Sequence, residues 1–151
     1  MLLRRYNPKD CEALTSLFYH TVHNVNVKDY SQEQLKAWAN DKIDLEVWNK
    51  TFSVHYTVVA VENNIIVGFG DIDKLGYLDK LFVHKEYQRR GFATAICDEL
   101  ERVVKTDKIT THSSITAKLF FEQRGYKLVK EQQVQKNDIA LTNYIMEKQV
   151  R

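Results

Sequence analysis

Proline and glycine are scarce in this sequence, with one proline and five glycines among 151 residues. So few residues of this kind argue against a flexible linker or a low-complexity region, and no internal repeat is visible. Cysteine is scarce as well. Cys11 and Cys97 form no disulfide framework and lie in stretches with helical apolar spacing. We therefore expect two buried free thiols in a reducing cytoplasm.

Long apolar runs and a large net charge are also missing. No apolar run approaches the roughly 20 residues of a membrane span, and no apolar segment follows Arg4 and Arg5 as in a signal peptide. A net charge of +2 is too small to indicate nucleic-acid binding by itself. We expect a cytoplasmic chain with no membrane or nucleic-acid partner, folded as a single domain over residues 1–151.

The most informative stretch is residues 88–93, Gln-Arg-Arg-Gly-Phe-Ala. It follows a strand-like apolar run and opens a segment with helical apolar spacing, so Gly91 stands where a helix begins. Unpaired N–H groups and the positive end of the helix dipole suit a phosphate there, and glycine lets it approach. Arg89 and Arg90 add positive charge. Taken alone, the stretch also fits an ordinary basic helix start, and it is neither a Walker loop nor a dinucleotide fingerprint.

Periodicity and turn residues predict the element order β α α β β β α β α β β. The expected strands cover residues 1–6, 54–61, 65–72, 77–83, 108–112, 126–134 and 139–146. Helices are expected from 8 to about 25, from a capping box at Ser31 and Gln34, after Gly91, and after a cap at Ser113 or Ser114. Residues 40–52 have near-helical apolar spacing. Turns at 62–64 and 136–138 predict two hairpins.

The motif around Gly91 resembles the acetyl-CoA signature of the GCN5-related N-acetyltransferases (GNAT), Q/R-x-x-G-x-G/A, with Ala93 as the second small residue. Residues 117–126 are similar to the family's A-x-x-x-Y-E-x-x-G-F helix, and the element order is the family's. The resemblance covers essentially the whole chain. It implies an α/β (α+β) GNAT fold: a mixed central sheet of about seven strands, splayed between strands 4 and 5, with helices on both faces.

The resemblance also implies acetyl-CoA as the acyl donor, with no metal. The fourth strand would pair with the pantetheine arm, the N–H groups of residues 89–94 would hold the pyrophosphate, and the later helix would lie along the cofactor. The expected cofactor-binding residues are Leu81, Phe82, Val83, Gln88, Arg89, Arg90, Gly91, Phe92, Ala93, Thr94, Ser114, Ala117, Lys118, Phe120 and Phe121.

Acetyl transfer requires the acceptor ammonium to lose a proton, and family members commonly use a carboxylate on or near strand 4 for this step. Asp79 is the candidate base; the alternative is a structural partner for Lys80, Arg102 or a backbone N–H. Simple alternation predicts two faces for this strand. One face would carry Tyr77, Asp79, Leu81 and Val83, and the other Leu78, Lys80 and Phe82.

The family's acid is usually a tyrosine four residues before the helix-ending glycine, and that position here is Phe121. Phenylalanine has no proton to donate. Tyr126 is the candidate that would replace it, with Tyr30 or another group as further alternatives. Without a substitute, the thiolate leaves unassisted, or the chain binds acetyl-CoA without fast turnover.

For the acceptor we expect Tyr30, Trp38 and Tyr77 to contribute to a pocket, the alternative being plain core packing. The expected activity is transfer of an acetyl group to a primary amine of a small molecule or peptide. The competing hypothesis is an acyl-CoA-binding sensor or scaffold with little turnover. His20 and His23 lack further ligands at zinc spacing, so no metal site is expected. The chain is expected to be a monomer or a homodimer.

Overall fold

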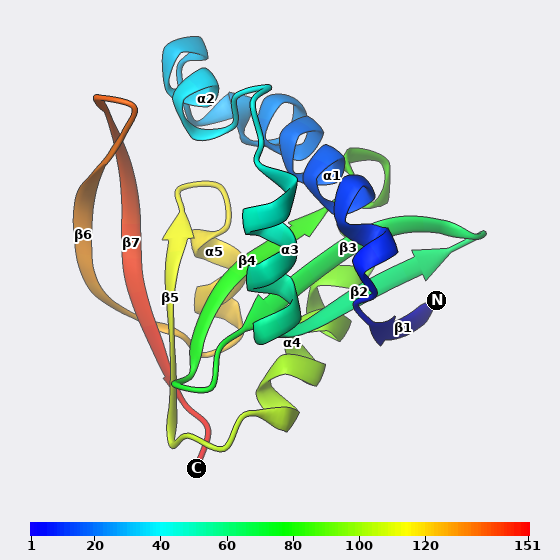
Figure 1. Cartoon of the computed structure of the whole chain (residues 1–151). Coiled ribbons are helices and arrows are strands. Elements are labelled where there is room, and N and C mark those ends of the chain that lie inside the picture. The colour runs from blue at the N-terminus through cyan, green and yellow to red at the C-terminus, as the bar shows by residue number, and fades with distance from the viewer.

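Seven strands form one mixed sheet in the computed structural model, which describes residues 1–151 (Figure 1). The strands are β1 (Leu2–Arg5), β2 (Tyr56–Glu62), β3 (Ile65–Ile72), β4 (Tyr77–Val83), β5 (Lys108–Ser114), β6 (Lys127–Lys136) and β7 (Ile139–Gln149). The α-helices are α1 (Cys11–Asn24), α2 (Gln32–Trp38), α3 (Leu45–Val54), α4 (Phe92–Val103) and α5 (Lys118–Gln123). The expected mixed α/β fold with seven strands is confirmed.

Local sequence signals account for the two tight hairpins. The β2–β3 turn places Asn63 and Asn64 at positive φ, and the β6–β7 turn does the same with Asn137 and Asp138. Asparagine and aspartate tolerate this backbone better than other residues with a side chain, and such two-residue turns match the twist of paired strands. Both predicted hairpins are therefore confirmed.

Helix starts follow their capping residues. Ser31 and Gln34 form the predicted reciprocal capping box at the start of α2, with bonds of 3.1 and 2.9 Å. Gly91 is the N-cap of α4 at φ 87°, a left-handed conformation that favours glycine. The predicted helix start at this glycine is confirmed.

Each face of the sheet has its own apolar core. The helices α1, α2 and α3 pack on one face, here the α1–α3 face, around Leu14, Phe52 and Phe69. Helices α4 and α5 pack on the opposite face, here the α4–α5 face, where Ile96 and Leu100 are fully buried. Cys11 and Cys97 are buried free thiols in these two cores, as predicted. None of the helices is both long and apolar enough to cross a membrane.

Strands β4 and β5 separate soon after they begin. They run parallel, but only Tyr77 with Thr110 and Leu78 with Thr111 are paired, and the Thr111 hydroxyl donates to the Leu78 carbonyl at 2.8 Å. Beyond this point β5 continues alongside β7 while β4 stays with β3 (Figure 1). The predicted splay between strands 4 and 5 is confirmed, and it leaves one edge of β4 unpaired.

Simple alternation along β4 proved wrong because the strand contains a β-bulge. Lys80 pairs with Asp71 and Leu78 pairs with Ile72, so Asp79 is an extra residue without a partner. Each β4 side chain after the bulge therefore lies on the opposite face of the sheet from the one that simple alternation predicts. Phe82 belongs with the α1–α3 core and Leu81 packs with Leu78 in the α4–α5 core. Asp79 and Lys80, expected on opposite faces, have their charged groups 2.8 Å apart.

Two predicted boundaries also need correction. The strand expected from residue 54 begins at Tyr56, because Val54 completes α3. Ser113 and Ser114, expected as a helix cap, belong to β5, which extends to pair with Tyr144 and Asn143 on β7. Ser114 still caps locally, since its hydroxyl accepts the Ala117 N–H at 3.1 Å.

A substitution at Gly70 tests how closely α4 packs on the sheet. A Cβ there would lie 2.8 Å from Ile96 Cγ2 and 3.1 Å from the Lys80 carbonyl oxygen. We predict that Gly70→Ala lowers the free energy of unfolding by about 1–3 kcal/mol through overpacking, measured by urea denaturation. Gly68→Ala, whose nearest contacts are 3.2 Å, should cost less. Equal stability of Gly70→Ala and wild type would contradict the close packing.

Candidate active site

A cleft of about 1140 Å³ opens where β4 and β5 separate. Its lining comes from α1, α2 and the turn before it, α3, both separating strands, the start of α4, α5 and the β6–β7 hairpin. Seventeen residues named from the sequence line it: Tyr30, Trp38, Tyr77, Asp79, Leu81, Phe82, Val83, Gln88, Arg89, Gly91, Phe92, Ala93, Thr94, Ser114, Ala117, Phe120 and Phe121. Three others, Arg90, Lys118 and Tyr126, do not.

One end of the cleft is the loop that joins β4 to α4. The Gln88 side chain donates to the Val83 carbonyl at 2.6 Å and ties this loop to the end of the strand. No atom outside the adjacent residues lies within 4 Å of where a Cβ of Gly91 would be, so the space at this glycine is open. Arg89 lines the cleft, but Arg90 turns away, 4.8 Å over the Tyr87 ring. An open helix start with one nearby guanidinium suits a phosphate group.

Helix α5 gives the cleft apolar side chains rather than an acid. Phe121 is only 3% exposed and packs 5.0 Å from the Tyr126 ring. Lys118 lies outside the cleft, 5.2 Å over the Tyr144 ring. Its expected role with the cofactor phosphates therefore has no geometric support.

Tyr126 cannot take the role of proton donor that we expected for it. Its hydroxyl donates to Glu101 Oε2 at 3.0 Å, and the side chain is buried outside the cleft. Burial, followed by the nearby Glu101 charge, raises the pKa of Tyr126 well above its usual range. A bound hydroxyl with a raised pKa that does not reach the cleft cannot protonate a leaving group there.

Tyr30 forms part of the opposite end of the cleft, and its hydroxyl is already engaged. It donates to the Thr142 carbonyl and accepts the Ile115 N–H, both at 2.9 Å. The neighbouring Asp29 accepts the Thr116 hydroxyl at 2.7 Å. Tyr30 therefore ties the segment before α2 to β7 and to the loop after β5. Its ring lines the cleft, but its hydroxyl has no free role.

The wall on the α1–α3 side of the cleft is aromatic. The Trp38 ring lies 5.4 Å from Tyr30 and 6.3 Å from Phe82. Tyr77 faces His112 across the point of separation, with ring centroids 5.1 Å apart. Burial, the largest cause, raises the pKa of Tyr77 to about 12, so its hydroxyl keeps its proton at neutral pH. His112 lines the cleft and was missed by the sequence, because nothing local marks which β5 side chains face the gap.

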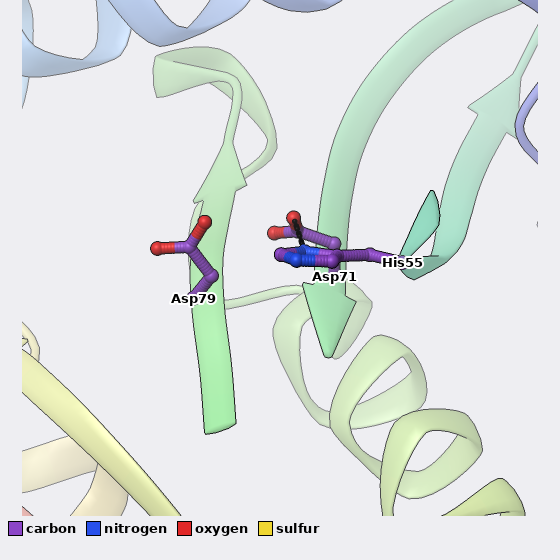
Figure 2. A group of neighbouring side chains, drawn as sticks. All are labelled: His55, Asp71 and Asp79. Carbon is purple, nitrogen blue, oxygen red and sulfur yellow. Dashed lines mark hydrogen bonds and ion pairs between the residues drawn. The ribbon is translucent and has the colours of Figure 1, made fainter. Parts of the chain in front are cut away.

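Asp79 lies in a network of charged groups (Figure 2). Its Oδ2 is 2.8 Å from the Lys80 ammonium, which lies 4.8 Å over the Trp48 ring. Behind it, the fully buried Asp71 pairs with His55 Nδ1 at 2.8 Å and accepts the Lys80 backbone N–H at 2.9 Å. No local signal predicts this network, because His55 and Asp71 are sixteen residues apart and meet only when β2 pairs with β3.

The ligand atoms of His55, Asp71 and Asp79 lie within 4.8 Å of one another, a spacing that would allow a metal ion. Their chemistry favours internal pairing instead. Both Asp71 oxygens already accept hydrogen bonds, and Asp79 already faces an ammonium group. These residues are therefore best described as two ion pairs, linked through the backbone and side chain of Lys80.

The hydrogen bond to Asp71 raises the pKa of His55, and the nearby charges of Asp71, Asp79 and Asp73 act in the same direction. The imidazole therefore carries its second proton at higher pH than a free histidine. Burial, the largest cause, raises the pKa of Asp71, while the hydrogen bond from His55 and the Lys80 charge lower it. A positive His55 therefore offsets part of the cost of burying a carboxylate here.

Comparison with known proteins gives consistent matches. A model of the acetyltransferase (GNAT) domain matches residues 26–148. The chain is 37% identical over 146 residues to the uncharacterised N-acetyltransferase YafP of Escherichia coli strain K12, covering 95% of this chain and 93% of that protein.

Two solved structures extend the comparison. A GCN5-related N-acetyltransferase from Rhodopseudomonas palustris superposes with a TM-score of 0.94 at 30% identity, over 98% of this chain and 94% of that one. The PaiA N-acetyltransferase from Thermoplasma acidophilum, solved with coenzyme A, gives 0.80 at 16% identity over 98% of both chains. The second likeness concerns the fold alone.

The His55–Asp71 pair predicts a pH-dependent stability. Because the pKa of His55 is raised above the usual value of about 6.5, its contribution is full below that pH and is lost as pH rises through the raised pKa. We predict that the stability advantage of wild type over His55→Gln is full below about pH 6.5 and shrinks as pH rises through the raised pKa of His55, measured by urea unfolding. The exposed His20 provides the control, and His20→Gln should show no such trend. A pH-independent difference for His55→Gln would contradict the assignment.

Proposed function

The chain belongs to the GNAT acetyltransferase family, and from this premise we propose that it moves the acetyl group of acetyl-CoA directly to a primary amine. The acceptor would be a small molecule or a peptide. The observation that carries the proposal is the cleft at the separation of β4 and β5, which runs from the open start of α4 to the Asp79 carboxylate.

The chemistry of the residues at the cofactor end of the cleft supports acetyl-CoA as the ligand. The N–H groups at residues 89–94 would hold the pyrophosphate, helped by the Arg89 guanidinium and the Thr94 hydroxyl. The unpaired edge of β4 at Leu81–Val83 would hydrogen-bond the pantetheine arm as an added strand does. Ala117 and Phe120 would contact it from α5. Acetyl-CoA supplies the activated acetyl group, and these residues would fix its direction in the cleft.

Asp79 is our candidate general base. The bulge places its carboxylate on the α1–α3 face of β4, while Leu81 and Val83 remain on the α4–α5 face toward the cofactor helices. Base and cofactor would then approach the reaction centre from opposite sides, as direct transfer requires. A β4 backbone N–H on the unpaired edge would polarise the thioester carbonyl.

The choice of a primary amine is supported by Lys80. Its ammonium occupies the space between the Asp79 carboxylate and the Trp48 ring, so this part of the cleft already accommodates an alkylammonium group. An acceptor amine would have to compete with Lys80 for Asp79. Tyr77 and Trp38 would contact the rest of the acceptor.

No side chain is assigned to protonate the leaving thiolate. Phe121 has no proton to give, and the Tyr126 hydroxyl is held outside the cleft by Glu101. A thiol has a pKa of about 8.5, so coenzyme A can depart as a thiolate without an acid. The reaction would be slower than with a positioned acid but still possible.

Thiol release from acetyl-CoA with a panel of small amines and amino-terminal peptides tests the proposal, after thermal shift with acetyl-CoA has established binding. Amine-dependent release of coenzyme A is the expected result. Binding without release from any amine would instead favour a sensor or scaffold that retains the fold and the cofactor.

Gly91 tests the phosphate end of the cleft. We predict that Gly91→Glu abolishes acetyl-CoA binding, because a carboxylate at the α4 start would cover the N–H groups and repel the pyrophosphate. Titration calorimetry measures this loss. The control is Gly91→Asn, which is neutral and tolerates the positive φ of this position. Wild-type affinity in Gly91→Glu would rule out the phosphate site.

Asp79 tests the proposed chemistry. We predict that Asp79→Asn lowers turnover by about 10²-fold or more, the lower end for a lost general base, and leaves acetyl-CoA affinity unchanged. The rate is followed across pH with the best amine of the panel. The control is Asp98→Asn, an exposed carboxylate on α4 outside the cleft. If Asp79→Asn keeps the wild-type rate at neutral pH, the base lies elsewhere.

A further inference from the structure

The Asp71 carboxylate is fully buried and has two hydrogen-bond partners, of which His55 is drawn in Figure 2. Its Oδ1 accepts the Lys80 backbone N–H, and its Oδ2 accepts from His55. The backbone ladder already joins β3 to β4, so Asp71 is not needed to hold the two strands together. What Asp71 adds to the ladder is the hydrogen bond that its Oδ1 accepts from the Lys80 backbone N–H.

That residue is the first one after the β-bulge. A bulge leaves ladder groups without their regular partner, and here the Lys80 N–H is met by a side-chain carboxylate. Without the bulge, a strand that kept Leu81 and Val83 in the α4–α5 core would turn Asp79 to that face as well. Asp71 therefore supports the irregularity that brings the Asp79 carboxylate to the α1–α3 side of the cleft.

We propose that Asp71, with His55 as its counter-ion, is a positioning residue that holds the β4 bulge and thereby aims Asp79 at the acceptor amine. This inference rests on the proposed function and on Asp79 as its base. Asp71 contacts neither substrate nor cofactor in this scheme, because it is fully buried and does not line the cleft.

His55 is a counter-ion here and not a second base. Its Nδ1 donates to Asp71 at 2.8 Å, and this contact favours the protonated ring, which has no lone pair with which to accept a proton from Asp79. Lys80 contributes the remaining positive charge at 2.8 Å from Asp79. Asp71 with His55 and Asp79 with Lys80 thus form two separate acid–base pairs.

Two substitutions of Asp71 separate geometry from charge. Asp71→Asn keeps an oxygen for the Lys80 N–H and can donate its amide to a neutral His55, so the bulge should persist. Asp71→Ala removes that oxygen. The matched control is Asp10→Ala. Like Asp71, Asp10 is a buried carboxylate that accepts a backbone N–H and pairs with a basic side chain, in its case Arg4. Asp10 lies away from the cleft.

The measurements are acetyl-CoA affinity, amine turnover per folded molecule, and hydrogen exchange at the Lys80 amide. We expect Asp71→Ala to speed exchange and to lower turnover by about tenfold or more, since small misplacements of a catalytic group cost up to about 10²-fold. Its acetyl-CoA affinity should stay within about twofold of wild type, because the phosphate loop is untouched. Asp71→Asn should retain slow exchange and most of the turnover.

Equal turnover for Asp71→Ala and Asp10→Ala would overturn the proposal, and so would an Asp71→Asn variant as impaired as Asp71→Ala. If Asp71→Ala does not fold, Asp71→Asn decides alone, because loss of either slow exchange or turnover contradicts the inference. If wild type itself releases no coenzyme A with any amine, the proposed function fails. Exchange at the Lys80 amide then still determines whether Asp71 holds the bulge.

Discussion

The cleft depends on the short pairing between β4 and β5. Two residue pairs and the Thr111–Leu78 hydrogen bond hold them together, and beyond Leu78 each strand has a partner on one side only. An unpaired strand edge inside a protein is costly unless something else bonds to it. The same gap that leaves the backbone of β4 incomplete therefore defines a place for an extended ligand. Side chains of both strands pack in the α4–α5 core: Leu78 and Val83 from β4 and Ile109 from β5.

The bulge at Asp79 adds a second constraint, because it changes which side chains face each side of that gap. After one extra residue, the α4–α5 face of β4 carries apolar side chains, while the α1–α3 face carries Asp79 and Lys80. This arrangement gives the α4–α5 side an apolar surface and the α1–α3 side two charged groups beside the aromatic Phe82. A regular strand could not have put Leu78 and Leu81 on one face, as they are here, since they are three residues apart.

Local signals in the sequence predicted much of this fold. The hairpins depend on Asn63, Asn64 and their counterparts at 137–138, and the start of α4 depends on Gly91, so each can be predicted within a few residues. The bulge, the His55–Asp71 pair and the engagement of Tyr126 with Glu101 depend on strand register and packing between distant segments. No short window of sequence contains that information. A family resemblance identified the cleft residues well, but it could not predict which hydroxyls are already bound.

The partners of the tyrosines narrow the chemistry of the cleft. Tyr126 donates to Glu101, and Tyr30 both donates to Thr142 and accepts from Ile115, so neither hydroxyl is free to act on a substrate. Buried polar groups that are fully paired mainly stabilise one arrangement of the chain. Tyr77, Asp79 and His112 remain as cleft groups near the separating strands, and burial keeps the Tyr77 hydroxyl protonated. A single carboxylate beside an ammonium-binding space fits deprotonation of an amine better than acid-assisted departure of a thiol, and under the proposed function turnover would depend on the direction in which Asp79 points.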